Sequence, residues 1–357
     1  MSSRAVSVKK SMIQNAVNQL QKSDFEVYNY NLPDIELCFE LLARHQSHAF
    51  PSLLLKFCEN IDRLKPHTTQ ELKLLSHIIS AMPVLIGRKN RRDNLQDNIV
   101  YERENLIAIN DVTFKKIINS PEYPLALAKR GGYFYNINGK KLKQLRKEKN
   151  LSQSKLAKKI GVSRKSISSY ENTNMRASIE KAKKMKEILD GSVVLPMDFY
   201  TMIKNKIDET IDFLELKIEL QQRITKKTEE FINSINEIVE ETGFKTFWPK
   251  ASPLDIFIFQ EDEDSHKVSK MMFFGGTNYD GKEKITKITQ ERFLQQQIPH
   301  SKKKGIIYDE QDVKIDKHKQ STLPYLSAAE LRLLENPKEF KKHLYRKFLK
   351  LQEINPN

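Results

Sequence analysis

A short segment near the middle of the chain carries polar side chains at the spacing of one helical face. Between residues 164 and 172, Ile167 and part of Tyr170 are expected to face a core, which leaves the opposite side polar and basic. The residues on that side are Arg164, Lys165, Ser168 and Ser169. Guanidinium and ammonium groups donate hydrogen bonds to base edges in the major groove of DNA, and small serines let a helix sit deep in it. The pattern predicts base contacts, with Arg164 the first candidate and Lys165 the second.

The residues that must position this face read as a helix-turn-helix within 139–190. Leu142 and Leu145 give a first helix an inward side. The residues expected to point outward from it are Lys141, Lys143, Arg146 and Lys147. Ser152 and Ser163 are predicted N-caps of the second and third helices, and Gly161 permits the left-handed backbone of the turn between them. The predicted phosphate contacts, near the ends of these two helices, are Gln153, Lys155 and Asn172.

The charge of the chain is concentrated in the same segment. Residues 139–190 hold 16 Lys or Arg against 5 Asp or Glu, a net of +11 out of +15 for all 357 residues. A basic surface binds a polyanion because neutralised phosphates release their counterions. Such focusing indicates a dedicated nucleic-acid module rather than a generally basic protein.

Between residues 145 and 172 the sequence contains, in order, L-R, L-S-Q, L-A, G-V-S, I-S and E-N. This pattern resembles the Cro and phage-repressor type of helix-turn-helix. The resemblance implies a recognition role for Arg164, Lys165 and Ser169 and phosphate contacts for Gln153 and Asn172. A three-helix protein-interaction module with basic surfaces is the alternative for this segment. An RNA reader is disfavoured, because the exposed face lacks stacking aromatics.

Over residues 11 to about 330 the chain also resembles an archaeal family of HTH-type transcriptional regulatory proteins. The segments that carry this resemblance are 83–87 (PVLIG), 100–103 (VYER) and 128–133 (AKRGGY). It implies binding of double-stranded DNA and control of transcription, without a target gene or ligand. Residues 130–133 could place an arginine arm against DNA or form a plain turn.

The two ends of the chain read as α/β domains, because strands alternate with helices in both. In the first end we expect a strand pair at 39–43 and 53–57, a helix with apolar residues from Leu72 to Met82, and strands at 84–86 and 106–109. In the second end we expect, among other elements, a helix at 285–294. The order strand, loop, strand, helix, strand in both ends resembles the restriction-endonuclease-like fold.

The expected regions are 1–125 (α/β), 126–198 (all-α helix-turn-helix), 199–240 (helical connector) and 241–357 (α/β). Two local matches suggest that the ends are diverged copies of one domain. They set 17–20 and Phe25 beside 235–238 and Phe244, and 110–113 beside 327–330. Chance similarity of two α/β patterns is the alternative.

Nuclease chemistry is the competing function, since metal-assisted cleavage needs carboxylates to hold the ion and a Lys to orient water. The first end offers Glu40 and Lys56 but has Leu54 at the second acid position. The second end offers Asp255, with Met272 and Phe274 assigned to the acid and Lys positions. Neither set could hold a metal as such sites are usually built. The expectation is therefore no catalytic residue, no enzyme, and a structure-selective DNA-processing protein as the alternative.

The connector carries apolar residues at spacings of three and four, which favours a long helix or helix pair. They are Ile203, Ile207, Ile211, Leu214, Ile218, Phe231, Ile235 and Ile238. We expect the protein to be a homodimer, with this seam as one means of association. Packing of the same residues on their own domain is the alternative.

No metal or cofactor is expected. Cys38, Cys58, His45 and His48 lack the spacing of a zinc site, and Gly275-Gly276 is too short for a phosphate loop. No signal core or membrane-spanning run is present in this sequence, and two cysteines suit a reducing compartment. These features predict a cytoplasmic protein that acts on duplex DNA, with transcription machinery or an effector as further partners that the sequence does not identify.

Overall fold

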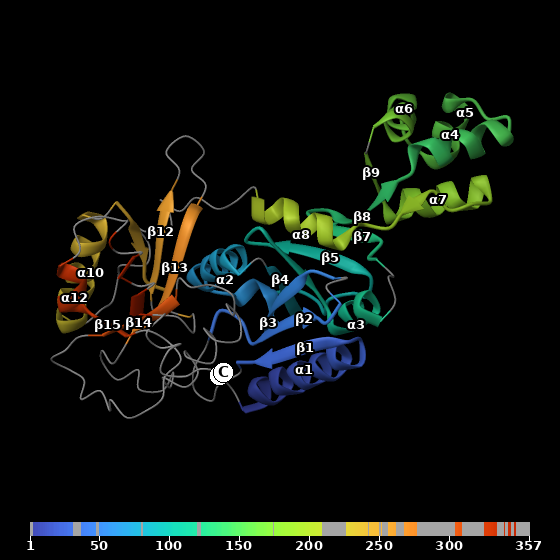
Figure 1. The fold of residues 1–357 in the computed structure, drawn as a ribbon. Helices are drawn as coiled ribbons and strands as arrows, with labels where there is room; N and C mark the ends of the chain where they lie inside the picture. The colour runs from blue at the N-terminus through green and yellow to red at the C-terminus, as the bar shows by residue number, and fades with distance from the viewer. Residues whose placement is uncertain are drawn as a thin grey trace. The chain divides into compact units, whose positions relative to one another are not determined.

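A computed structural model forms two compact units (Figure 1). The structure describes residues 3–30, 37–47, 50–79, 81–119, 123–173, 175–208, 226–241, 243–249, 251, 256–261, 268–276, 304–308 and 325–333, together with 339, 342–343 and 346–347. The first unit comprises residues 1–30, 39–69 and 80–211, and the second comprises 31–38, 70–79 and 212–357.

The first unit is built on a ten-stranded mixed sheet. Its order is β1-β2-β3-β4-β6-β5-β7-β8-β10, and β9 pairs with β8. The strands are β1 Phe25–Asn29, β2 Leu41–His45, β3 Ser52–Asn60, β4 Ala81–Lys89, β5 Ile99–Arg103, β6 Leu106–Ile109, β7 Ala126–Lys129, β8 Gly132–Ile137, β9 Arg176–Ser178 and β10 Val194–Leu195. The first three strands are antiparallel neighbours, whereas β3, β4 and β6 run parallel. The predicted strand pair at Phe39–Ala43 and Leu53–Phe57 is thus confirmed as β2 and β3.

The centre of this sheet is covered by helices. Apolar runs in β3 and β4, such as Leu53–Leu55 and Val84–Ile86, are buried, as parallel strands covered on both faces require. The helices that contact the sheet are α1 Ser3–Lys22, α3 Asp111–Asn119 and α8 Phe199–Asp208. Figure 1 shows α1 and α3 beside the blue and teal strands. The α/β expectation for the N-terminal region is confirmed.

Two connections follow β3 before the next strand. They are the short 3-10 helix η1 (Ile61–Arg63) and helix α2 (Pro66–Ile78), which begins with Pro at its first position, where the missing N–H has no helical partner anyway. Met82 was expected on the apolar face of this helix. It lies in β4 instead, because parallel pairing of Met82 with Leu53 extends that strand.

Two hairpins that the sequence pattern did not predict, β5–β6 and β7–β8, are closed by residues with a left-handed backbone conformation. Glu104 and Asn105 have φ values of 48° and 58° in the β5–β6 turn, and Gly131 and Gly132 have 96° and 130° between β7 and β8. Consecutive positive φ values suit the tight turns that join twisted antiparallel strands. Residues 130–133 therefore form a turn and the start of β8, which is the plainer of the two interpretations.

The helix-turn-helix lies after β8 as expected. Its helices are α4 Gly139–Glu148, α5 Gln153–Ile160, α6 Arg164–Asn172 and α7 Ile179–Leu189. Their inward faces form a separate core that includes Leu142, Leu156, Ala157 and Ile167. Strand β8 pairs with β7 on the sheet side and with β9 and β10, which flank α7. The sheet therefore crosses the expected boundary at residue 125 and continues into the DNA-binding region.

Part of the expected connector belongs to the core of each unit. Ile203 on α8 is buried in the N-terminal core, and Ile235 and Ile238 on α10 (Lys226–Glu241) are buried in the core of the second unit. These three side chains are therefore not a seam between two chains, since packing on their own sheets takes up their apolar surface. Residues 211, 214 and 218 lie outside the described residues, as do the side chains of residues 207 and 231.

The second unit contains a five-stranded sheet in the order β11-β12-β13-β14-β15. Its elements after α10 are β11 Lys245–Phe247, β12 Ile256–Glu261, β13 Val268–Gly276, β14 Lys304–Tyr308, β15 Tyr325–Ser327 and α12 Ala328–Arg332. The first three strands are antiparallel neighbours, and the last two pairings are parallel. The helix expected at 285–294 lies outside the described residues.

Candidate nucleic-acid interface

Helix α6 presents the predicted contact residues to solvent. Arg164 and Lys165 are exposed, whereas Ser168 and Ser169 are half-buried farther along the helix. Ile167 faces the core, and neither basic residue makes an ion pair with any residue that the structure describes. The structure therefore leaves two cations available at the start of α6.

The ends of α5 and α6 are held by side-chain caps. The hydroxyl oxygen of Ser152 accepts a hydrogen bond from Lys155 N at 3.1 Å, and that of Ser163 accepts one from Ser166 N at 3.0 Å. Gly161 has a φ of 78° between the two helices, a conformation that other residues adopt with strain. The predicted caps and turn are confirmed, and they fix where α6 begins.

An ion pair that sequence analysis missed anchors the far end of α6. Arg146 Nε and Nη2 donate to the two carboxylate oxygens of Glu171 at 2.5 and 3.1 Å, and Arg146 Nη1 donates to Leu151 O at 2.7 Å. Both residues are buried. The expectation that Arg146 points outward is wrong, because a bidentate carboxylate and a backbone carbonyl satisfy its donors inside the bundle.

The same network bears on the predicted phosphate contacts. Gln153 is half-buried, and its Nε2 donates to Glu171 Oε2 at 2.8 Å, so this side chain ties α5 to α6. Asn172 is exposed and donates to Ser168 Oγ at 3.3 Å, while Lys155 is exposed in the first turn of α5. Lys155 and Asn172 are open to a backbone contact, whereas Gln153 already has a structural partner.

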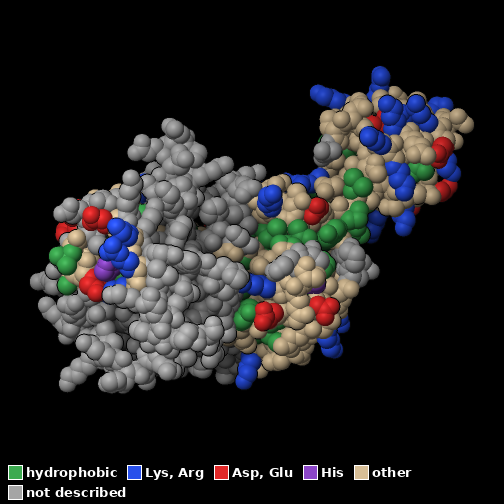
Figure 2. All heavy atoms as spheres, in the orientation of Figure 1, with side chains coloured by type: hydrophobic (Ala, Val, Ile, Leu, Met, Phe, Trp, Pro, Cys, Tyr) green, Lys and Arg blue, Asp and Glu red, His purple; other side chains and the backbone are tan. Residues whose placement is uncertain are grey.

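The electrostatics of this surface favour an anion. Burial by itself would raise the pKa of Glu171, but hydrogen bonds from Arg146 and Gln153 and nearby positive charges hold it below the ordinary 4.5. Glu171 is also the only acidic residue in α5 and α6. The one carboxylate of these helices is thus buried and paired. Figure 2 shows Lys and Arg side chains spread over the visible face of this domain.

A close approach of backbones also shapes this site. A Cβ on Gly139, the first residue of α4, would lie 2.5 Å from the carbonyl oxygens of Tyr170 and Glu171. Only glycine lets the start of α4 pass so close to the end of α6. The sequence feature that could have indicated this contact is the Asn138-Gly139 pair at the start of α4.

The candidate nuclease residues form a buried ion cluster. Glu40 Oε1 lies 2.6 Å from Lys9 Nζ and 2.9 Å from Lys56 Nζ, and Glu40 Oε2 accepts a hydrogen bond from Phe57 N at 2.7 Å. Leu54 occupies the second acid position and is fully buried. Both carboxylate oxygens are engaged, and two ammonium groups adjoin them. These residues do not fit a divalent metal ion.

A zinc site near the first hairpin receives no support. Burial raises the pKa of the Cys58 thiol to about 12, even though the neighbouring Lys56 lowers it. A thiol must lose its proton to bind zinc. Among the described residues no group of three His, Cys, Asp or Glu could hold a metal, and His48 lies outside them.

Comparison with known proteins identifies two domains in the first 194 residues of the chain. Residues 9–124 match a family described as PD-(D/E)XK superfamily domain, and residues 142–194 match one described as helix-turn-helix. The N-terminal region is thus a nuclease-like α/β domain, and a helix-turn-helix domain follows it. No helix in the described part of the chain is long and apolar enough to cross a membrane.

The similar full-length proteins come from archaea and are named HTH-type transcriptional regulatory proteins. The protein of Pyrococcus furiosus is 32% identical over 64% of this chain and 67% of its own length. The protein of Methanococcus vannielii is 29% identical over 74% and 78%, respectively. The chain belongs to this archaeal family of HTH-type transcriptional regulatory proteins.

The extent of similarity differs among relatives. The protein of Thermococcus gammatolerans is 33% identical, and the chain spans 59% of its length. Among solved structures, a chain of the SinR protein/SinI protein complex is 32% identical over 27% of this chain and 92% of its own, with a TM-score of 0.15.

Proposed function

We propose that this protein binds specific sequences of double-stranded DNA through α6 and thereby regulates transcription. The observation that carries the proposal is the exposure of Arg164 and Lys165, which make no ion pair with a described residue. They lie on a helix whose start is capped by Ser163 and whose end is anchored by Glu171. A rigid helix with free donors at its N-terminal end suits the major groove. We expect this DNA binding to take place in the cytoplasm, where archaeal cells hold their DNA.

The individual contacts follow from exposure along α5 and α6. Arg164 is assigned the bidentate contact to guanine, and Lys165, Ser168 and Ser169 complete the base-reading set. Lys155 and Asn172 are assigned to phosphates, which fix orientation without specifying sequence. Gln153 was predicted to join them. Its hydrogen bond to Glu171 supports a different role, in which it orients α6 from within the domain.

The test is selection of genomic duplex fragments by the purified full chain, without metal, across roughly 50–300 mM salt, followed by sequencing of the retained DNA. A recurrent sequence that survives high salt supports the proposal. Uniform retention that collapses as salt rises would contradict it, because purely electrostatic binding carries no sequence preference.

We also infer that the protein acts as a homodimer on a symmetric site. Two recognition helices would then address half-sites about 34–36 Å apart, one turn of duplex. The dimer contact would use surfaces other than Ile203, Ile235 and Ile238, because those side chains are buried within their own units. Sedimentation equilibrium of the free protein, together with a footprint showing two half-sites, tests this inference. A monomer that protects one half-site would contradict it.

We propose further that the nuclease-like domain is not an enzyme. The support is the cluster of Lys9, Glu40 and Lys56, in which ammonium groups occupy the space around the one carboxylate. Metal-assisted hydrolysis needs several oxygen ligands with open positions. Incubation of supercoiled DNA with the protein and Mg²⁺ or Mn²⁺ should yield no cleavage. Cleavage that disappears in Lys56→Ala would contradict the proposal and favour the alternative of a DNA-processing enzyme.

We propose that the second unit is a diverged copy of the N-terminal domain. The strands β1-β2-β3-β4-β6 of the ten-stranded sheet have the same relative directions as β11-β12-β13-β14-β15. The pairing registers can therefore be followed from strand to strand in both. If Glu26 corresponds to Lys245, the pairings equate Leu41 with Ile256 and Leu55 with Phe274.

Continuing across the parallel strands, the same registers equate Val84 with Gly305 and Ala108 with Tyr325. Asp111 then corresponds to Ala328, and these residues begin α3 and α12. The registers thus lead from the match of Phe25 with Phe244 to the match of 110–113 with 327–330, which lies 85 residues later in the first copy. In this correspondence β5 is an insertion in the first copy.

The correspondence also corrects the assignment of site positions in the second copy. Leu54 and Lys56 correspond to Phe273 and Gly275. These positions lie one residue beyond Met272 and Phe274, which the sequence analysis assigned. Asp255 lies outside the described residues. An aromatic ring and a glycine cannot bind metal, so the second copy is proposed to be inactive as well. An experimental structure in which these pairs fail to superpose would contradict the duplication.

A further inference from the structure

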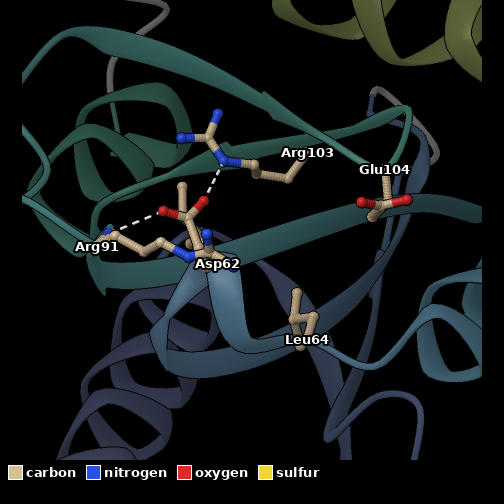
Figure 3. A pocket seen from close by; sticks show the side chains of 6 residues that line it. Asp62, Leu64, Arg91, Arg103 and Glu104 are labelled. Atoms are coloured by element: carbon tan, nitrogen blue, oxygen red, sulfur yellow. Dashed lines mark hydrogen bonds and ion pairs between the residues drawn. The ribbon is translucent and has the colours of Figure 1, made fainter.

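A pocket of 260 Å³ lies in the first unit, away from the helix-turn-helix residues and the buried ion cluster (Figure 3). It is lined by Ile61, Asp62, Leu64, Arg91, Arg103 and Glu104. These residues come from η1 and its continuation, from the loop after β4, and from the β5–β6 hairpin. Two of the segments that carry the family resemblance, 83–87 and 100–103, end beside it.

The walls of the pocket are held by specific local contacts. A Cβ on Gly87 would lie 2.3 Å from Ile61 Cγ2, so glycine is what allows η1 to lie against β4. The side chain of Asn60 caps η1 by accepting from Asp62 N at 2.9 Å. The Asn90 carboxamide oxygen accepts from Arg92 N and Asp93 N at 2.8 and 2.7 Å, which shapes the loop that carries Arg91.

Both signs of charge line the pocket, and Asp62 is already paired with Arg103. Asp62 accepts from Arg103 Nε and, at 2.8 Å, from Arg91 N, while Arg103 Nη1 donates to Glu102 O at 2.7 Å. Burial would raise the pKa of Asp62, but these hydrogen bonds and the two arginine charges hold it below its ordinary value. Figure 3 shows Arg91 and Arg103 near Asp62, with Glu104 on the other side.

These features decide which ligand chemistry fits. The two guanidinium groups and two carboxylates give the lining a formal charge of zero, and Ile61 and Leu64 add an apolar wall. A bare anion would face Asp62 and Glu104, and a bare cation would face both arginines. A molecule with both charges and a short apolar group meets each part of the lining with its complement. The volume lies just below the range of about 300–1,000 Å³ typical of pockets for drug-sized ligands, which favours a small molecule.

We propose that this pocket binds a free amino acid with an apolar side chain. The carboxylate of the amino acid would accept hydrogen bonds from the guanidinium of Arg91 and from Nη2 of Arg103. Its ammonium would face Glu104, and its side chain would lie against Leu64 and Ile61. Asp62 orients Arg103 for this contact rather than binding the ligand itself.

The experiment is calorimetric titration of the full chain with each of the common amino acids, without DNA. We expect saturable binding of an apolar amino acid, and weaker binding, by about tenfold or more, of its amide and its N-acetyl derivative, since each lacks one charge-assisted hydrogen bond. Arg91→Ala and Glu104→Gln should each weaken binding to a similar degree. The matched control is Arg92→Ala, one residue along the same loop and outside the lining, which should leave the Kd unchanged.

Three results would overturn the proposal. One is the absence of heat with every amino acid. Another is that the amide and the N-acetyl derivative bind as tightly as the free amino acid. The third is that Arg91→Ala and Glu104→Gln both leave the Kd unchanged. Inorganic phosphate serves as a further probe, and its preferential binding would show an anion site instead. Because no DNA is present, these results are independent of whether α6 reads bases.

Discussion

The exposed face of α6 and the buried cluster around Glu40 use the same kinds of side chain in opposite ways. Arg164 and Lys165 extend into solvent and have no ion pair among the described residues. The Lys56 side chain is 1% exposed and lies on a carboxylate. A buried charge must be paired, because its desolvation costs several kcal/mol, whereas an exposed cation stays available to a phosphate or base. Exposure therefore separates cations that hold the fold from cations that are available to bind DNA, as proposed for Arg164 and Lys165.

Arg146 shows that the distinction does not follow domain boundaries. It belongs to the basic helix-turn-helix, yet it is buried against Glu171 and serves the fold. If the comparison holds, substitutions of buried pairs will change stability, and substitutions on the face of α6 will change DNA binding alone.

The largest effect is expected for Glu40→Gln. Removal of the carboxylate leaves the ammonium groups of Lys9 and Lys56 without a counter-charge, and the unfolding free energy should fall by about 3–5 kcal/mol. Urea denaturation followed by circular dichroism measures it. The matched control is Glu59→Gln on the same sheet, whose 2.9 Å pair with Lys89 is at the surface and should matter little. Equal effects of both variants would refute the structural role of the cluster.

The next effect is expected for Glu171→Gln, which removes the partner of Arg146 and should cost about 3 kcal/mol. Because the folded-state pKa of Glu171 is lowered, its contribution is present above the ordinary value of 4.5 and is lost as the pH falls through the folded pKa. The difference in stability between wild type and variant should therefore shrink as the pH falls below 4.5. Denaturation curves across pH 3–7 measure this, and a constant difference would speak against the pair. The exposed Glu180→Gln on α7 serves as control.

Arg164→Ala should relax sequence preference by roughly 1–3 kcal/mol without changing stability. The reason is that this side chain contributes a base contact but no packing inside the domain. Competition binding with the selected sequence and with random duplex measures the preference. Unchanged binding to both would show that α6 is not the recognition helix, whatever the rest of the chain does.

The smallest effect is expected for Lys155→Ala. Loss of one phosphate contact should weaken binding to all sequences alike and reduce the slope of log affinity against log salt by about 1. Titrations at several salt concentrations measure that slope. A change in preference between sequences, with the slope unaltered, would place Lys155 at a base instead.

Much of the DNA-binding domain could be predicted because its determinants are local. Caps at Ser152 and Ser163, the glycine in the turn and the period of apolar residues each act within a few positions of the chain. The strands β3, β4 and β6 were also evident, since buried parallel strands read as apolar runs. Short or partly polar strands such as β1 and β8 were missed, because pairing with distant partners stabilises them more than their own composition does.

The sequence by itself determined the class of DNA-binding module, the position of the helix proposed to read bases, and the presence of a leucine, Leu54, at the second acid position. Only the tertiary structure decided that Arg146 is buried, that Gln153 contacts Glu171, and that β8 continues the N-terminal sheet into the helix-turn-helix. It also brought Asp62, Arg91 and Arg103 together from three separate segments. The physical reason is that helix periodicity and caps depend on neighbours in sequence, whereas ion pairs, register and pockets depend on residues brought close by folding.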